Sequence, residues 1–364
     1  MPVRVVVGMS GGVDSSVAAA RLLTAGFEVV GATLRLWNPP GARADDENHA
    51  SLRFVQRARA VAEQLGVPHH VVDWRDQFEP EIITRFVEAY LRGQTPSPCV
   101  GCNRHIKLPA LSALAAQVGA EYVATGHYAR VDRKGPRPRL LRGVDRSRDQ
   151  SYFLQLLPAE VLQRLMLPLG ESTKAEVRAE ASRLGLPVAG ERDSQELCFI
   201  PDGGHVRFVA ERAGHRLRHG RIVDAAGREV GRHRGIHAFT IGQRKNLGVA
   251  LGRRAYVVSL DAATGTVGLG EREDLLSAGA VLVGARLDAD VQLPVRCDAV
   301  VRYRSQPVRA QVCVGAPSEL RLSFDEPVRA VVPGQFVGLY SGDQVLGGGM
   351  IASAIPSGRG REVP

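Results

Sequence analysis

Two sets of residues in this sequence have types and spacings that could carry chemistry. The first is a segment near the N-terminus that consists of Gly8, Met9, Ser10, Gly11, Gly12, Val13, Asp14 and Ser15. Its glycines can adopt backbone angles closed to other residues and so let main-chain N–H groups approach a ligand. A helix that begins beside such a turn directs its positive end at the same place. The segment, which we call the glycine loop, therefore predicts a phosphate-binding site.

The second set is found among the five cysteines, Cys99, Cys102, Cys198, Cys297 and Cys313. Cys99 and Cys102 have the Cys-x-x-Cys spacing of redox or metal-binding sites. Prolines and glycines before Asn103 predict a loop, which places Cys102 at the start of a helix. There the helix dipole and the nearby Arg104, His105 and Lys107 would lower its pKa. A buried packing cysteine is the alternative for Cys102 and for Cys198, whereas Cys297 and Cys313 fall in predicted strands and are expected in the core.

A strand and a helix must hold the glycine loop in place. The loop follows the β-branched run Val5–Val7 and precedes an apolar stretch with helical spacing, which predicts strand, turn and helix. Further strands are expected at 28–34, 68–73 and 121–131. Their alternation with helices predicts a parallel sheet covered on both faces, where ligands bind at the carboxyl ends of the strands. We therefore expect ligand contacts at Leu34 and at Gly126.

The pattern changes in the second half of the chain. From about Gly220 helical periodicity fades into short alternating strands and glycine-bearing turns. From Gly279 to Ser353 the pattern is wholly strand and turn, which predicts a small closed β-barrel. The expected fold is α/β: a Rossmann-like parallel-sheet domain, a small mixed central domain and a C-terminal β-barrel. We place these domains at 1–157, 158–278 and 279–356, followed by a disordered tail at 357–364.

Composition narrows the class of partner. The 364 residues carry a formal net charge of +9, which favours a polyanionic partner such as nucleic acid. No run approaches the roughly 18 apolar residues of a membrane-spanning helix, and the N-terminus lacks a signal-peptide pattern. We therefore expect a cytoplasmic protein without a membrane partner.

The glycine loop matches neither the kinase-type phosphate loop nor the dinucleotide motif, since no lysine follows its glycines. Ser-Gly-Gly-x-Asp-Ser instead resembles the pyrophosphate loop (PP-loop) of ATP pyrophosphatases. This implies an adenine-nucleotide domain that cleaves ATP between its α and β phosphates. Further motifs follow in one order: Cys102-Asn103 with Ile106-Lys107, Gly126-His127-Tyr128, Asp149 to Leu154, Asp193-Ser194 before Cys198-Phe199-Ile200, and Ile241 to Lys245. Together they make the chain similar to bacterial tRNA-specific 2-thiouridylases along nearly its whole length.

The resemblance implies ATP-dependent thiolation of the wobble uridine of tRNA to 2-thiouridine. ATP and Mg²⁺ would bind at Gly8 to Ser15, Leu34 and Gly126, and the uracil 2-oxygen would be adenylated with release of pyrophosphate. A persulfide on Cys198 would supply the sulfur, and Cys102 would then close a disulfide with Cys198. The persulfide would come from a cysteine desulfurase or a sulfur-relay protein. The enzyme is expected to act as a monomer.

Matching positions also imply three contacts with tRNA and its anticodon arm. They are Ser97-Pro98-Cys99 near the target base, Arg148-Asp149-Gln150 beside a basic hairpin, and Arg302-Tyr303 in the barrel. Many family members carry Asn-Pro-Asp where this chain has Ser97-Pro98-Cys99. A thiol therefore replaces a carboxylate that the family places near the base.

This departure leaves a second mechanism open, in which Cys99, Cys102 and Cys198 hold a [4Fe–4S] cluster with one open iron for sulfide. A zinc site is disfavoured because a second Cys-x-x-Cys pair is missing. Two further alternatives are another adenylating enzyme of the PP-loop superfamily and a tRNA-binding protein without chemistry. The intact glycine loop argues against the binding protein.

Overall fold

The computed structural model describes residues 2–38, 50–191, 197–200 and 204–358. The chain divides into two compact units. The first unit consists of Met1–Ile82, Cys99–Phe199 and Asp343–Val345, and the second of Ile83–Pro98, Ile200–Gly342 and Leu346–Pro364. Each unit contains its own clusters of buried apolar side chains.

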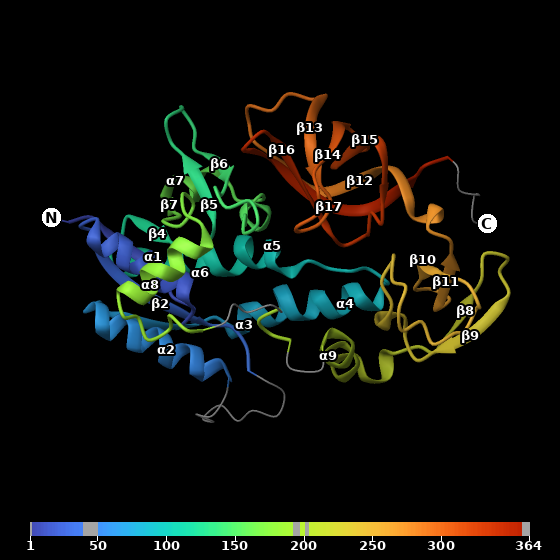
Figure 1. Ribbon diagram of the computed structural model, residues 1–364, viewed down its shortest axis with the longest axis horizontal. Coiled ribbons are helices and arrows are strands. Elements are labelled where there is room, and N and C mark those ends of the chain that lie inside the picture. Colours follow the sequence, from blue (N-terminus) through green and yellow to red (C-terminus); the bar gives the residue numbers. More distant parts are fainter. Residues whose placement is uncertain (1, 39–49, 192–196, 201–203, 359–364) are drawn as a thin grey trace. The chain divides into compact units, whose positions relative to one another are not determined.

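The first unit is built on a five-stranded parallel sheet of order β3-β2-β1-β4-β7. Figure 1 labels β2, β4 and β7 of this sheet. Its strands are β1 (Arg4–Gly8), β2 (Glu28–Arg35), β3 (His69–Asp73), β4 (Tyr122–Ala124) and β7 (Leu165–Met166). Val5, Val6 and Val7 of the central strand are fully buried. Because successive side chains of a strand point to opposite faces, both faces of the sheet are covered. The predicted parallel sheet is confirmed.

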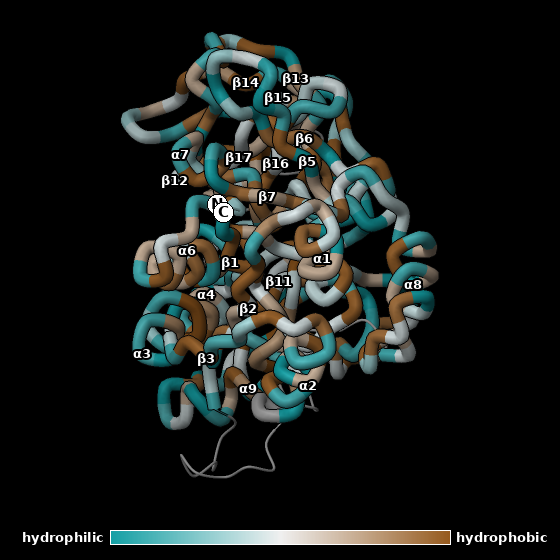
Figure 2. Tube along the Cα trace, turned by 90° about the vertical axis from the view of Figure 1, so that its left-hand side faces the viewer, coloured by the Kyte–Doolittle hydropathy of each residue, from teal (hydrophilic) through white to brown (hydrophobic). Residues whose placement is uncertain are grey.

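Helices and helical turns accompany these strands along the chain. They are α1 (Val13–Thr24), α2 (Ala50–Leu65), α3 (Arg75–Phe78), α5 (Pro98–Cys102), α6 (Leu108–Gln117), α7 (Ala159–Arg164) and α8 (Lys174–Arg183), with the π-helical turns η1 (Glu79–Thr84) and η2 (Asn103–Lys107) and the 3-10 turn η3 (Ser151–Phe153). Buried side chains of α1, α2 and α8 share one cluster with β1 and β2. In the hydropathy-coloured trace, β1 and β2 are largely hydrophobic (Figure 2). Helices α1 and α8 lie side by side, and Arg21 pairs with Glu180 at 2.7 Å.

A hairpin of β5 (Ala129–Asp132) and β6 (Arg139–Arg142) follows the sheet. Arg130 donates to the Asp343 carboxylate at 2.6 Å, and Arg146 also binds this carboxylate. The next residue, Gln344, pairs with Leu141 of β6. A short turn at Asp343 and Gln344 therefore holds the hairpin in place where β5 begins and β6 ends.

The second unit begins with α4 (Arg85–Leu91), α9 (Gly204–Ala213) and the 3-10 turn η4 (Gly214–Arg216). The rings of Phe86 and Phe208 pack at 6.3 Å, and Tyr90 stacks on His205 at 4.8 Å, so the two helices hold each other. A four-stranded sheet follows in the order β10-β11-β8-β9. Its elements are β8 (Gly220–Val223), β9 (Glu229–His233), the 3-10 turn η5 (Ile236–Ala238), β10 (Tyr256–Asp261) and β11 (Thr266–Gly270).

Six further strands close into the predicted β-barrel. They are β12 (Leu276–Leu287), β13 (Val295–Val300), β14 (Val308–Val314), β15 (Glu319–Arg329), β16 (Phe336–Ser341) and β17 (Gln344–Pro356), preceded by the 3-10 turn η6 (Glu273–Leu275). Their order is β12-β15-β14-β13-β16-β17, and pairing of β12 with β17 completes the ring. Cys297 is buried in its core as expected, whereas Cys313 is only half-buried, because the strand turns that side chain away from the core.

The α/β fold with a Rossmann-like sheet, a central domain and a barrel is thus confirmed, while the domain limits at 157, 278 and 356 stay predictions. One local prediction is wrong. The segment before Asn103 is not a loop, since α5 begins at Pro98 and leads directly into η2 and α6. Proline is tolerated in the first helical turn because its missing N–H has no intrahelical partner there. None of the helices in the described ranges combines the length and hydrophobicity needed to cross a membrane.

Candidate active site

The glycine loop connects the central strand β1 to α1 and requires glycine at Gly11. Gly11 has φ +71°, and a Cβ on it would lie 2.3 Å from the carbonyl oxygen of Phe54. The next residue, Gly12, is the N-cap of α1, and its extended backbone provides no side-chain cap. Within the described part of the chain, the first N–H groups of α1 are therefore left to bind an anion.

Hydroxyl groups fix the shape of this loop from within. The Ser15 hydroxyl accepts a hydrogen bond from the Ser10 N–H at 3.1 Å and donates one to the Gly12 carbonyl at 3.1 Å. The Ser16 hydroxyl donates to the same carbonyl at 2.9 Å. From the neighbouring strand, the Thr33 hydroxyl of β2 donates to the Met9 carbonyl at 2.7 Å. The backbone is thus preorganised before any ligand arrives.

Asp14 is held by two side chains from elsewhere in the first unit. The Lys174 ammonium lies 2.8 Å from each carboxylate oxygen of Asp14, and the Tyr128 hydroxyl donates to Asp14 Oδ1 at 2.7 Å. The same ammonium lies 5.9 Å from the centre of the Tyr128 ring. Lys174 is the first residue of α8, after a capping box in which Thr173 and Glu176 exchange hydrogen bonds. The fold therefore brings a lysine to a loop whose own sequence has none.

Lys174 was not among the residues that the sequence indicated. It lies 160 positions after Asp14, so no local pattern connects the two. The sequence contains only four lysines, and this one follows a capping signal. Its side chain is only 9 % exposed, which is unusual for a lysine and indicates a specific role beside Asp14.

Leu34 and Gly126 both lie at the carboxyl edge of the sheet. Leu34 is half-buried near the end of β2, where it pairs with Val72. Gly126 follows β4, and a Cβ there would lie 2.8 Å from the backbone nitrogen of Ser15. The close approach that makes glycine necessary at 126 is therefore to the start of α1.

The three cysteines of interest lie in the first unit, and the charge of Lys107 acts on each of them. Cys99 lies in the first turn of α5 and Cys102 at its end, while Cys198 follows in a separate turn. Each thiolate would raise the pKa of Lys107, and Lys107 in turn lowers the pKa of each thiol. Asp193 and Ser194, which precede Cys198, lie outside the described residues.

Burial overrides this favourable charge. It raises the pKa of Cys102 to about 12 and also raises the pKa values of Cys99 and Cys198. The prediction of a lowered pKa at Cys102 is therefore wrong, because burial of the thiol outweighs the charge of Lys107. The thiol also lies inside a continuous helical segment and not at a helix start. Cys198 has an exposed side chain, so it is accessible to a donor even though neighbouring protein atoms disfavour its thiolate.

Phe199 anchors the segment that carries Cys198. Its ring is 2 % exposed and packs edge-on against Phe78 at 5.8 Å. All five cysteines are free thiols. In the part of the chain that the structure describes, no group of three histidine, cysteine or acidic side chains is arranged to hold a metal ion.

His127 follows Gly126 and stays neutral. Burial, together with the charge of Lys107, lowers its pKa to about 3. Its Nδ1 lies 2.8 Å from the Thr125 hydroxyl. The histidine therefore serves as a neutral hydrogen-bonding group across the physiological range.

The residues 148–150 mainly support the hairpin. The Asp149 carboxylate accepts hydrogen bonds from the N–H groups of Gly143 at 3.0 Å and Ser151 at 3.1 Å. Gln150 accepts one from the Tyr128 N–H at 3.0 Å, and Tyr128 is the residue that binds Asp14. Two of the three expected tRNA contacts thus have partners within the first unit, and one of them positions the glycine loop. Arg148 is half-buried beside them.

The remaining sequence-predicted contacts belong to the second unit. Arg302 and Tyr303 lie in the turn after β13, where the Arg304 guanidinium stacks 5.1 Å from the Tyr303 ring. Arg302 is exposed. Ser97 and Pro98 are half-buried where the chain enters α5.

Three protein families match successive parts of the chain. Residues 3–202 match the tRNA methyl transferase HUP domain, residues 206–271 the tRNA methyl transferase PRC-barrel domain, and residues 281–351 the aminomethyltransferase beta-barrel domain. The first match covers more than half of the sequence and contains the glycine loop and the three clustered cysteines.

Relatives match over nearly the full length. A tRNA-specific 2-thiouridylase MnmA from Sorangium cellulosum is 51% identical over 360 residues, which cover 97% of this chain and 93% of the relative. Proteins of the same name from Moorella thermoacetica and Carboxydothermus hydrogenoformans are 46% and 44% identical, over 95% and 96% of this chain and 99% and 97% of theirs. The chain therefore belongs to the tRNA-specific 2-thiouridylase family.

Proposed function

We propose that this protein uses ATP to convert the wobble uridine of tRNA to 2-thiouridine, with release of AMP and pyrophosphate. The observation that carries the proposal is the presence, in one unit, of a preorganised phosphate loop and of three thiols around Lys107. Relatives that bear the name tRNA-specific 2-thiouridylase along almost the whole chain support the same substrate.

The first step is adenylation of the uracil 2-oxygen. That oxygen attacks the α phosphate of ATP, and the bond to the β phosphate breaks with release of pyrophosphate. The N–H groups at the start of α1 bind the departing phosphates, and the Lys174 ammonium shifts from Asp14 to neutralise them. Mg²⁺ prefers one or two carboxylates together with substrate phosphates, a donor set that Asp14 fits, and would supply charge neutralisation there.

The second step transfers sulfur. The terminal sulfur of a Cys198 persulfide attacks uracil C2, and AMP leaves with the former oxygen. The Cys102 thiolate then attacks the Sγ atom of Cys198, which forms the Cys102–Cys198 disulfide and leaves sulfur on C2. An external thiol reduces the disulfide. A cysteine desulfurase or relay protein restores the persulfide on Cys198, whose exposed side chain supports this role.

We favour the persulfide mechanism because the side chain of Cys198 is exposed, whereas Cys99 is half-buried and Cys102 is buried. A [4Fe–4S] cluster on the three thiols makes a different prediction for Cys99, since all three would be required. Cys99 stands where family members carry a carboxylate, and we assign it, with Ser97 and Pro98, to contact with the target base. A base in a single-stranded loop can be flipped out toward these residues at low energetic cost.

Further tRNA contacts are proposed at Arg148 and at Arg302-Tyr303. Arg302 is exposed, which suits a contact with a phosphate, and the Tyr303 ring with the Arg304 guanidinium beside it is of the type that contacts bases in RNA. Cytoplasmic location, a monomeric state and the sulfur donor stay proposals of the same kind.

Nucleoside mass spectrometry tests the function directly. Unmodified tRNA is incubated with the full-length protein, ATP-Mg²⁺ and a persulfide donor, beside the variants Cys198→Ser, Cys99→Ser and Cys313→Ser. We expect 2-thiouridine from the wild type, from Cys99→Ser at a reduced rate and from the Cys313→Ser control, and none from Cys198→Ser. Complete loss of product in both Cys198→Ser and Cys99→Ser, with iron in the wild-type protein, would favour the cluster. Binding of tRNA without any thiolated product would contradict the proposal.

A further inference from the structure

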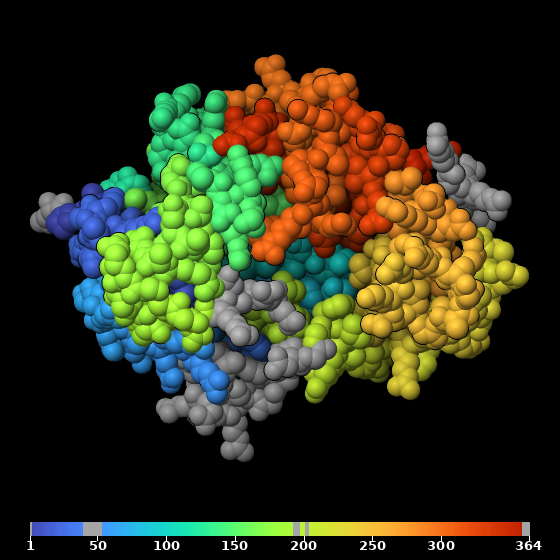
Figure 3. Space-filling view, in the orientation of Figure 1, coloured from blue at the N-terminus to red at the C-terminus, as the bar shows by residue number. Residues whose placement is uncertain are grey.

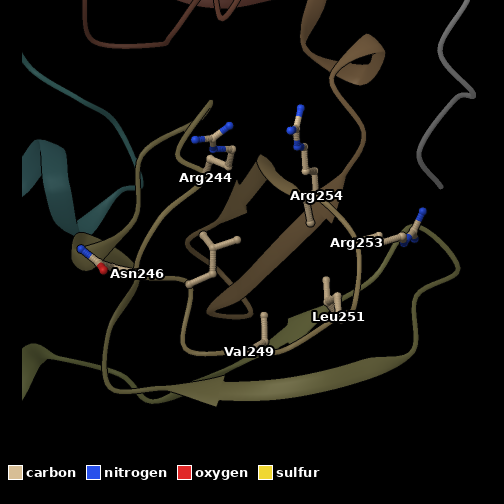
Figure 4. Close-up of a pocket in the computed structure, with 8 residues that line it drawn as sticks. Arg244, Asn246, Val249, Leu251, Arg253 and Arg254 are labelled. Carbon is tan, nitrogen blue, oxygen red and sulfur yellow. The ribbon is translucent and has the colours of Figure 1, made fainter.

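The motif from Ile241 to Lys245 has no role in the chemistry described above, yet it borders a pocket in the second unit. The pocket has a volume of about 390 Å³. Its lining residues are Arg244, Asn246, Leu247, Val249, Leu251, Arg253, Arg254 and Ala255 (Figure 4). We call this site the arginine pocket.

The wall of the arginine pocket is held in one conformation. The Gly242 N–H donates to the Val257 carbonyl at 2.8 Å, and the Val257 N–H donates to the Gln243 carbonyl at 2.9 Å. The Gln243 side chain accepts from the Thr240 N–H at 3.0 Å and donates to the Lys245 carbonyl at 3.0 Å. Positive φ angles at Asn246, Gly248 and Gly252 turn the chain around the cavity.

Apolar side chains form the floor. Leu247 and Ala255 are buried in one cluster with Val257 of β10 and Val267 of β11. Val249 packs against Gly231 of β9 so closely that a Cβ on Gly231 would lie 2.4 Å from it. The floor is therefore part of the core of this sheet and does not depend on a ligand for its shape.

Arginines give the rim of the pocket a positive charge, and among the described residues two of them have no carboxylate partner. Arg253 pairs with Glu271 at 2.9 Å, but Arg244 and Arg254 form no ion pair with a carboxylate among the described residues. In Figure 4, Arg244 and Arg254 extend to the same side of the pocket from opposite walls, while Val249 and Leu251 lie at its base. Two exposed guanidinium groups above an apolar floor suit a ligand with an anionic and an apolar part.

We propose that the arginine pocket binds one backbone nucleotide of the tRNA substrate, with its phosphate between Arg244 and Arg254 and its sugar over the apolar floor. This inference rests on the proposed function for the identity of the RNA. A volume of about 390 Å³ is within the range of small-ligand sites, so one nucleotide fits. Arg244, Arg253 and Arg254 at the rim are exposed. Yellow to gold residues, which include this part of the chain, lie at the surface in Figure 3. The net charge of +9 favours such a polyanion.

The test measures the affinity for unmodified tRNA against salt concentration. The full-length wild type is compared with Arg244→Gln, Arg254→Gln and the double variant. Arg234→Gln is the matched control, because Arg234 is exposed, lies in the same unit outside the pocket and has no carboxylate partner among the described residues. Loss of one phosphate contact should reduce the slope of log K against log salt by about 0.7–0.9.

We expect each pocket variant to weaken tRNA binding about threefold to tenfold near physiological salt, with the reduced slope, and the double variant to lose more. Arg234→Gln should change affinity less than twofold. Unchanged affinity and slope in the double variant would overturn the proposal, as would an equal effect of Arg234→Gln. Because all these side chains are exposed, matching thermal unfolding curves confirm that the variants fold.

A second arm separates RNA from a free nucleotide. Modification of Arg244 and Arg254 by phenylglyoxal is followed with AMP or with tRNA present. Protection by tRNA and not by AMP supports the proposal, and protection by AMP alone contradicts it. The 2-thiouridine assay keeps the two proposals apart. If wild-type protein makes no product but the pocket variants still bind tRNA more weakly, the proposed reaction is wrong and the proposed tRNA contact at the arginine pocket is supported.

Discussion

The glycine loop and the thiol cluster around Lys107 lie in the same unit but differ in how ready they are to act. In the glycine loop, hydroxyl groups fix the backbone, and Asp14 already has Lys174 and Tyr128 as partners. In the thiol cluster, burial raises the pKa of all three thiols in spite of Lys107. For the proposed reaction this means that adenylation uses a backbone already in place and needs only the shift of Lys174 from Asp14, whereas sulfur transfer needs a change that creates a thiolate. The comparison teaches that one unit can contain both a preorganised site and a site whose reactive groups are still protonated.

The largest effect is expected at Lys174. Lys174→Met removes the cation from the glycine loop, and tRNA-dependent pyrophosphate release should fall by about 10²–10³, the range for loss of one transition-state charge partner. Lys174→Arg should keep part of the rate. Arg183→Met, an exposed residue at the end of α8, is the control. A wild-type rate in Lys174→Met would show that this ion pair is only structural.

A smaller effect is expected when Lys107 is replaced by Met. Lys107 lowers the pKa of each thiol, so its removal raises them further and leaves fewer thiolates at a given pH. Single-turnover sulfur transfer should slow on the order of tenfold at pH 8, and its pH profile should move to higher pH. Pyrophosphate release should stay near the wild-type rate. Arg104→Gln is the matched control. Arg104 is a basic residue of the same helical turn, but the charge that lowers the pKa of these thiols is that of Lys107. A shift of the profile to lower pH would contradict this account.

The rigidity of the glycine loop can be tested at Gly126. A methyl group there would meet the backbone of Asp14 and Ser15 at 2.8 Å, so Gly126→Ala must move the start of α1. We expect the free energy of unfolding to fall by about 1–3 kcal/mol, as for overpacked sites, and the KM for ATP to rise. Gly190→Ala has open space around its Cβ and serves as the control in chemical denaturation and ATP titration. Equal stability of the two variants would mean that the loop adapts easily.

The smallest effect is expected at Thr173, which precedes Lys174. Thr173→Ala breaks the capping box with Glu176 and should lower the free energy of unfolding by about 1 kcal/mol. Thr173→Ser keeps the hydroxyl and should retain most of the stability. A loss of pyrophosphate release as large as that of Lys174→Met would show that the cap also positions the lysine.

Residues close together in the sequence were the ones that could be predicted. The strand, glycine loop and helix around Asp14 are consecutive, so periodicity and glycine placement predicted the strand, turn and helix of the sheet, while the phosphate site there stays a prediction. The closed barrel was likewise predicted from alternating strands. Lys174 escaped because its place beside Asp14 results from the packing of α8 on α1, which no local pattern encodes.

The setting of Cys102 was missed for a related reason. Proline and glycine before Asn103 predict a loop, but proline is compatible with the first turn of α5, and one glycine inside a helix costs only about 1 kcal/mol. The pKa of Cys102 then follows from burial, which depends on segments distant in the sequence. The roles of Asp149 and Gln150 inside the hairpin were hidden in the same way, since their partners lie on other elements.

The burial of Phe199 against Phe78 has a kinetic consequence. Cys198 and Cys102 belong to one chain, so an encounter of the two thiols is intramolecular, and the Phe199 ring holds the segment of Cys198 in the unit that contains Cys102. A flexible tether alone supplies an effective concentration in the millimolar range. In the proposed reaction, a free thiol in solution must reach a comparable concentration before it intercepts the sulfur on Cys198. The aromatic anchor would thus favour Cys102 over free thiols without any contact to the sulfur atom itself.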